Sequence, residues 1–185
     1  KYRIKNNKRR RDGYTTGAGA AGATRGAVRM LLSGASLSEV ELQTPKRITL
    51  NLQLHDITRE ETHVSCAVQK DAGDDPDTTN GILVYAKVEK ISAEAAKNII
   101  DNQNTDSKKV IIHSSIILDG GVGVGQVTKP GLSQKVGEAA INPVPKAMIL
   151  REAEEAAQEY DYEGYLKITI SVPEGEEISK KTFNP

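Results

Sequence analysis

Alternation of apolar and polar residues in several short segments constrains the fold of this chain more than any other feature. The alternating segments are residues 47–54, 63–70, 82–90 and 165–172. A period of two places the apolar side chains on one face of a strand and the polar ones on the other. A further strand is predicted at 110–118. The pattern therefore predicts a one-faced β-sheet covered by helices, which is an α+β fold, rather than a doubly covered parallel Rossmann sheet.

Two longer helices are predicted to cover that sheet. The first follows Thr15 and Thr16, contains apolar residues at helical spacing, and ends before Gly34. The second begins after Asn142, with Pro143 as its first residue. Its apolar stripe consists of Ile149, Ala153, Ala156 and Tyr160. Shorter predicted elements are a helix over 92–101 and a polar loop over 101–109.

Composition excludes several classes of function. The chain has one cysteine, Cys66, so an internal disulfide and a thiolate metal cluster are excluded. Lys+Arg and Asp+Glu both number 25, which gives no global charge toward nucleic acid. The basic run at residues 8–11 is a local exception, for which a solvated terminal segment is one interpretation. No apolar stretch approaches the ~20 residues that span a bilayer, so we expect no membrane association and a cytoplasmic location.

An acidic stretch, KDAGDDPDTTNG at residues 70–81, lies between two predicted strands. An EF-hand is unlikely, since Pro76 stands where the loop counted from Asp71 needs glycine, and Ala86 stands where the loop counted from Asp75 needs glutamate. Asp-Pro and Asn-Gly dipeptides form turns, but a turn does not explain four aspartates within seven positions. A looser Mg²⁺ site, a site that binds ligand hydroxyl groups and a solvated turn all stay open.

A glycine-rich stretch, DGGVGVGQVTKPGL at residues 119–132, is the second candidate site. Gln126 and Thr128 stand where a dinucleotide fingerprint needs glycine, and Pro130 follows Lys129 where a P-loop needs serine or threonine. The functional interpretation is a flexible loop with open backbone N–H groups that ends in the cation of Lys129. The alternative is a strand-to-loop transition with bulges.

The start of the first helix, GYTTGAG at residues 13–19, is the third candidate. Its free N–H groups and helix dipole favour an anion. Four glycines within this helix each cost roughly 1 kcal/mol against alanine, which close packing or a ligand would offset. The three histidines stand alone in strand-like segments, so structural or surface roles are favoured.

Four stretches follow one another in a fixed order: DGYTTGAGAAGA from residue 12, KDAGDDPDTTNG from residue 70, GGVGVGQVTKPG from residue 120 and GEAAINPVPKAMI from residue 137. Together they resemble the CbiD family, the cobalt-precorrin-5B C(1)-methyltransferases of anaerobic cobalamin biosynthesis. Gly19 departs from the family, whose members often carry cysteine there, which argues against a thiol nucleophile at that position.

The resemblance implies methyl transfer from S-adenosylmethionine, as co-substrate, to C1 of cobalt-precorrin-5B, which gives cobalt-precorrin-6A. Cobalt would arrive only within the corrinoid substrate, so no metal ligands are expected. The chemistry needs alignment and electrostatic stabilisation more than a covalent nucleophile. Rival hypotheses are an Mg²⁺-dependent phosphoryl-transfer enzyme and a non-catalytic module that binds an anionic ligand. A homo-oligomer and other cobalamin-pathway enzymes are the macromolecular partners left open.

On this basis we predict three catalytic residues, which are Asp71, Asp75 and Lys129. The predicted substrate- and cofactor-binding residues are Thr15, Thr16, Gly17, Asp74, Asp77, Thr79, Gly120, Gly121, Gly123, Gly125, Thr128 and Asn142.

The family resemblance also predicts the domain organisation. Residues 1–12 are expected to form a basic segment, 13–175 a CbiD-like N-terminal α+β domain, and 176–185 the start of a linker. Members of the family continue beyond this point into a second α/β domain, which we expect to be absent here. If that domain holds much of the S-adenosylmethionine site, the chain would be inactive alone.

Overall fold

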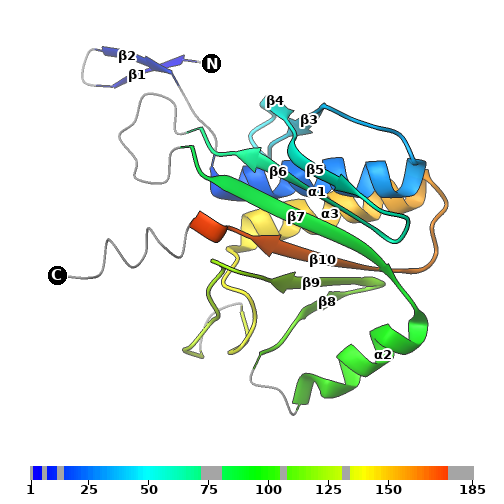
Figure 1. The fold of residues 1–185 in the computed structure, drawn as a ribbon. Coiled ribbons are helices and arrows are strands. Elements are labelled where there is room, and N and C mark those ends of the chain that lie inside the picture. Colours follow the sequence, from blue (N-terminus) through cyan, green and yellow to red (C-terminus); the bar gives the residue numbers. More distant parts are fainter. Residues whose placement is uncertain are drawn as a thin grey trace.

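A computed structural model describes residues 15–71, 81–103, 108–130 and 134–174, and the backbone of 2–5, 8–11 and 104. A six-stranded sheet forms its centre (Figure 1). In spatial order the strands are β5 (His55–Arg59), β6 (His63–Gln69), β7 (Leu83–Ile91), β10 (Tyr165–Ser171), β9 (Ile116–Gly120) and β8 (Ile111–His113). Only the β9–β10 pair is parallel. This mostly antiparallel sheet confirms the predicted α+β class.

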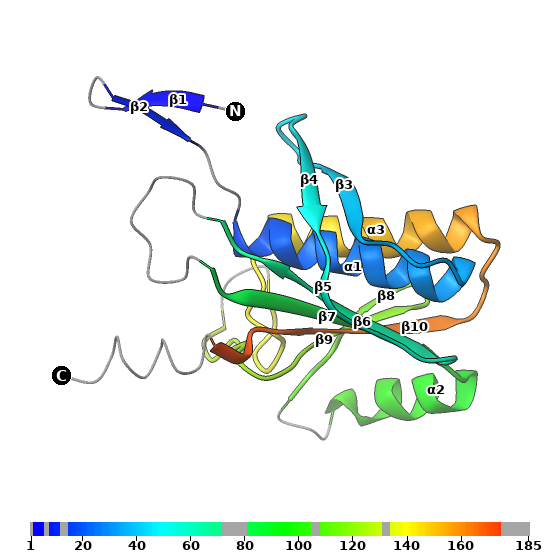
Figure 2. The ribbon, with the colours of Figure 1, turned by 45° about the horizontal axis from the view of Figure 1, so that its top comes forward.

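Helices lie on both sides of the sheet, but unequally. The longer helices α1 (Thr16–Ser33) and α3 (Pro143–Glu159) cover one face, and α2 (Ala93–Asp101) with the 3₁₀ turn η1 (Asn102–Asn104) lies on the other (Figure 2). Two small two-stranded sheets, β1–β2 (Tyr2–Lys5, Lys8–Arg11) and β3–β4 (Glu39–Gln43, Thr49–Gln53), complete the described fold.

The main core lies between the sheet and the pair α1–α3, and it is aliphatic. The predicted in-phase residues of β6, β7 and β10 are buried there, namely Val64, Cys66, Val68, Val84, Ala86, Val88, Leu166, Ile168 and Ile170. The predicted stripe of α3 is buried at Ile149, Ala153 and Ala156, while Tyr160 is 37% exposed. Strands β7 and β10 alternate buried and partly exposed residues as predicted, whereas Ala67 in β6 and Ile117 in β9 are also buried, on the opposite face.

Close packing accounts for glycines within α1. A Cβ added at Gly22 would lie 2.4 Å from Leu52 Cδ1, and one added at Gly26 would lie 2.7 Å from Leu54 Cδ1. The glycines thus let β4 and the residue after it approach the helix backbone. Thr15 caps α1 by accepting a hydrogen bond from the Ala18 N–H at 3.1 Å, and Gly34 ends it in the left-handed conformation.

Three sequence predictions about elements were wrong or incomplete. The single strand expected at 110–118 is a hairpin, because the chain reverses at Ser114 and Ser115, with Ser114 at a φ of 54°. Residues 102–104 form a 3₁₀ turn instead of a loop. Strands β1, β2, β3 and β5 were not predicted at all.

Candidate functional site

One end of the sheet gathers most of the predicted site residues that the structure describes. We call it the site end, defined by the last residues of β6, β9 and β10 and the first of β7. The register pairs Gln69 with Leu83, and the parallel β9 and β10 both finish here, with Ile170 opposite Gly120. Because ligands commonly bind beyond the carboxyl ends of parallel strands, this end is the natural candidate.

The helices α1 and α3 run parallel to each other, and both begin at the site end. A Cβ added at Gly17 would lie 2.5 Å from the Cβ of Pro145, so the first turns of α1 and α3 touch. No described residue accepts a hydrogen bond from the N–H groups of Thr16 or Gly17. The start of α1 therefore offers free donors and a positive dipole end.

The start of α3 is poorer in donors than the sequence suggested. Asn142 holds the N-cap position as predicted, but its side chain makes no capping hydrogen bond. The physical reason is the sequence that follows, since Pro143 and Pro145 have no N–H to donate. Asn142 is exposed, so its amide is accessible to a ligand.

The first and last residues of the acidic stretch are both held at the site end by backbone hydrogen bonds. Lys70 donates to the carbonyl of Ile82, and Gly81 donates to the carbonyl of Lys70, each at 2.8 Å. Asp71, half-buried, follows at once. Asp74, Asp75, Asp77 and Thr79 lie outside the described residues. The structure thus brings Asp71 to the same end as Gly17.

The glycine-rich loop packs onto the end of β10. Gly121 donates to the carbonyl of Ile170 at 2.7 Å, and Val172 donates back to the carbonyl of Val122 at 2.8 Å. Gly120 donates to its neighbour Asp119 at 2.8 Å. The prediction of open N–H groups was therefore wrong for Gly120 and Gly121, since the Asp119 carboxylate and the Ile170 carbonyl accept from them.

Gly123 and Gly125 differ from the first two glycines. Both are exposed, and no described residue accepts a hydrogen bond from their N–H groups. Beyond them, Gln126 and Ala139 form an isolated bridge, which places exposed Thr128 and Lys129 in an outer loop past that bridge. The loop thus presents two free donors next to the sheet and a cation farther out.

Sequence reasoning missed three residues that pack against predicted site glycines: two contact the glycine loop, and one contacts Gly17 at the start of α1. They are Ser171 and Val172 at the end of β10, and Pro145 in α3. No local signal marks them, because each acts through a contact with a distant segment. The parallel pairing of β9 with β10, had it been known, would have pointed to the first two.

The single cysteine is not positioned for catalysis. Cys66 is fully buried, and its thiol donates to the carbonyl of Ala23 at 3.2 Å. Burial raises the pKa of this thiol to about 12. Since the thiolate is the reactive form, the folded chain holds Cys66 inert.

Thiol labelling checks this conclusion. At about pH 8 we expect the folded chain to react with a disulfide reagent about a hundredfold or more slowly than the chain unfolded in urea. The chain has one cysteine, so the signal reports Cys66 alone. Equal rates in the folded and unfolded states would contradict a buried neutral thiol.

The described part of the chain offers neither a metal-ligand cluster nor a membrane-spanning helix. It contains no group of three or more His, Cys, Asp or Glu side chains placed to hold a metal ion. None of its helices is both long and apolar enough to cross a bilayer. Asp74, Asp75 and Asp77 lie outside the described residues, so neither finding applies to them.

The site end combines donors and an acceptor over a short stretch of surface. Free N–H groups come from α1 and the glycine loop, and a carboxylate comes from Asp71. Such a mixture can hold anionic groups of a ligand against the N–H donors while the carboxylate accepts from hydroxyl or ammonium groups. These features describe a class of α+β protein whose sheet end carries the donors and the acceptor that an anionic small molecule would require.

Comparison with known proteins narrows this class. The sequence pattern of the CbiD family matches residues 3–185, and the chain belongs to that family. Its match includes β1 and β2, which precede the first of the four family-like stretches.

Similar curated proteins carry one name. A cobalt-precorrin-5B C(1)-methyltransferase of Ruminiclostridium cellulolyticum is 47% identical over 98% of this chain and 42% of its own length. A protein of that name from Thermoanaerobacter sp. is 45% identical over 100% of this chain and 44% of its own length. The chain therefore spans less than half the length of these relatives.

A solved structure has the same fold. The cobalamin biosynthesis protein CbiD of Archaeoglobus fulgidus aligns with a TM-score of 0.62 at 28% sequence identity. The alignment covers 99% of this chain and 51% of that protein. This similarity supports the fold of the described residues.

Proposed function

We propose that this chain forms part of an S-adenosylmethionine-dependent methyltransferase that converts cobalt-precorrin-5B to cobalt-precorrin-6A by methylating C1. The names of its relatives support the reaction. The observation that carries the proposal is convergence: the start of α1, the glycine loop, the start of α3 and both ends of the acidic stretch meet at the site end.

Methyl transfer requires an in-line geometry at the donor. The bond from sulfur to the methyl carbon breaks as the bond from that carbon to C1 forms, and the sulfonium sulfur keeps the electron pair. S-adenosylhomocysteine is then the leaving product. The protein's contribution is positioning and electrostatics, and in this proposal no side chain forms a covalent intermediate.

We assign the two halves of the site to the two ligands. N–H groups of Thr16, Gly17, Gly123 and Gly125 hold carboxylates of the corrinoid, assisted by the outer cation of Lys129. Asp71 and the aspartates that follow it accept hydrogen bonds from the hydroxyl or amino groups of S-adenosylmethionine. Their negative charge also balances the sulfonium charge of that molecule. Thr15, Gly120 and Gly121 support this arrangement through the cap and the strand-end hydrogen bonds.

The domain limits and the setting belong to the same proposal. Residues 13–175 act as the N-terminal domain of a longer methyltransferase, and the partner is a cobalt corrinoid in the cytoplasm. The basic segment at residues 1–12 precedes that domain.

A chimera tests the reaction. This chain would replace the corresponding region of the R. cellulolyticum relative, to which it is 47% identical. Supplied with S-adenosylmethionine and cobalt-precorrin-5B, the chimera is expected to form a product heavier by one methyl group, without added divalent metal. A folded chimera that binds both substrates without methylation would overturn the proposal, as would thermal stabilisation only by ATP with Mg²⁺.

The role of Asp71 is tested in the same chimera. Asp71→Asn is expected to lower kcat/KM by more than about tenfold, because it removes the negative charge proposed to face S-adenosylmethionine. The matched control is Glu41→Gln, on the exposed face of β3, which also removes one carboxylate charge. Equal kinetics for the two variants, with equal melting temperatures, would show that Asp71 does not contact the donor.

A further inference from the structure

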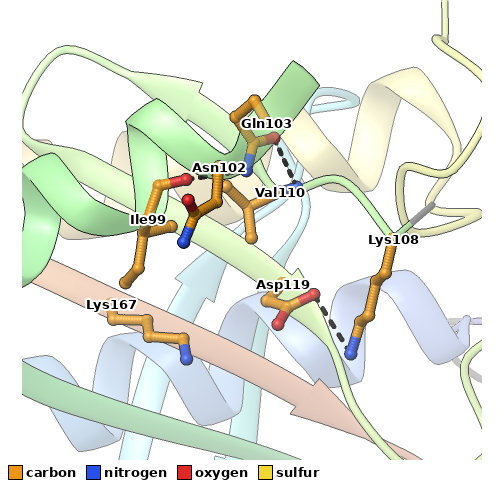
Figure 3. A pocket seen from close by; sticks show the side chains of 7 residues that line it. All are labelled: Ile99, Asn102, Gln103, Lys108, Val110, Asp119 and Lys167. Carbon is orange, nitrogen blue, oxygen red and sulfur yellow. Dashed lines mark hydrogen bonds and ion pairs between the residues drawn. The ribbon is translucent and has the colours of Figure 1, made fainter. Parts of the chain in front are cut away.

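A pocket of about 400 Å³ lies on the face of the sheet opposite α1 and α3. It is bounded by the end of α2 and by the outer faces of β9 and β10 (Figure 3). Ile99 supplies an apolar wall, and the side chains of Lys108, Asp119 and Lys167 supply charge. None of these four residues is among the predicted catalytic or binding residues, although Asp119 begins the glycine-rich stretch.

The one carboxylate of this pocket is already compensated. Asp119 is 14% exposed, accepts from the Gly120 N–H at 2.8 Å and lies 3.5 Å from the Lys108 amino group. Just after α2, the backbone carbonyl of Gln103 accepts a hydrogen bond from the Lys109 amino group. The partial negative charge at this helix end therefore also has a partner.

The ammonium group of Lys167 has no such partner. Among the described residues it makes no ion pair or hydrogen bond. Glu89 stands opposite it in the strand register, but Glu89 pairs with Lys87 at 3.5 Å. Two ammonium groups and one carboxylate therefore leave the pocket with one uncompensated positive charge.

We propose that this pocket binds a carboxylate group of a small molecule, with Lys167 as the main contact and Lys108 as the second. In Figure 3 the Lys167 and Lys108 amino groups flank Asp119 at the rim of the pocket. A partly enclosed ammonium beside an apolar wall pairs best with an anion that carries an apolar body.

The identity of the ligand rests on the proposed function. Asp119 directly precedes Gly120, so the pocket is continuous along the chain with the glycine loop. Both ligands of the proposed reaction carry carboxylates: the amino-acid end of the methyl donor, and the acetate and propionate side chains of the corrinoid. The shared chemistry is one carboxylate, and the experiment distinguishes the two sources.

Two pairs of probes differ in the carboxylate. S-adenosylhomocysteine is compared with 5′-methylthioadenosine, which lacks the amino-acid end, and cobyrinic acid is compared with cobinamide, which carries amides instead. Binding of each probe to this chain is measured by calorimetry. In one of the two pairs, we expect the carboxylate-bearing probe to bind with higher affinity than its partner. Lys167→Met is expected to reduce this ratio of affinities by about tenfold or more.

The matched control is Lys46→Met, which removes the same charge at an exposed position between β3 and β4, outside the pocket lining. It should leave the preference unchanged. All residues lining the pocket belong to this chain, so a folded chain that shows no carboxylate preference, or one that Lys167→Met does not alter, overturns the inference. Methylation by the chimera is measured separately. A failure of the pocket proposal would therefore leave the proposed methyltransferase function standing.

Discussion

Substitution of Gly123 by alanine is expected to lower the free energy of unfolding by about 2–4 kcal/mol. The added Cβ would lie 1.8 Å from the carbonyl oxygen of Val172, which is far inside van der Waals contact. That oxygen is backbone at the end of β10, so it cannot rotate away as a side chain would. Gly123 also has a φ of 78°, a conformation that L-residues adopt with strain.

Local hydrogen bonds make this position hard to relax. Val124 donates to the carbonyl of Gly121 at 3.1 Å, which closes a turn with Gly123 at its third position. Val172 donates to the carbonyl of Val122 at 2.8 Å. Moving Gly123 outward would therefore break the contacts that seat the glycine loop on the site end.

Urea unfolding and thermal melting measure the effect. For a chain of this size, the loss corresponds to a fall in melting temperature of roughly 4–16 °C. The matched control is Gly125→Ala, because a Cβ there meets nothing within 4 Å and its φ is not in the left-handed range. A control within about 0.5 kcal/mol of the parent is expected. Equal losses for both variants would show that the loop does not pack against β10.

The predictability of the fold depended on how far each signal extended along the chain. Strands β6, β7 and β10 each alternate over seven or nine residues, and they were predicted nearly to their ends. Strand β3 buries only Val40 and Leu42, which is too short a pattern to recognise. Strand β5 is exposed at all five positions, so it has no hydrophobic pattern at all.

The candidate site was predicted in its parts but not in its contacts. Thr15, Gly17 and Asp71 were identified because helix starts and clustered charges are local signals. The hydrogen bond that occupies Gly121 depends on the parallel pairing of β9 with β10, which no local pattern specifies, whereas Gly120 donates to the neighbouring Asp119 carboxylate. The pocket around Lys167 combines three separate segments, so single-segment motifs could not reveal it.

Substitution of Arg25 by methionine is expected to have the largest effect, lowering the free energy of unfolding by about 3–5 kcal/mol. Arg25 in α1 donates to Glu152 in α3 at 2.7 Å, and the Glu152 side chain is only 4% exposed. Without Arg25, a buried carboxylate loses its ionic partner. The same pair links the two parallel helices whose first turns bring Gly17 against Pro145 at the site end.

A double-mutant cycle separates charge burial from packing. Replacing both residues, as Arg25→Met with Glu152→Met, is expected to restore most of the loss, because no unpaired charge then remains in the interface. The comparison variant is Glu159→Gln, whose carboxylate pairs with Arg29 at 2.5 Å but is 54% exposed, so a change within about 1 kcal/mol is expected. If the double variant were as unstable as Arg25→Met alone, lost packing rather than an isolated carboxylate would be the cause. Recovery would instead show that the unpaired Glu152 carboxylate, and not lost packing, destabilises Arg25→Met.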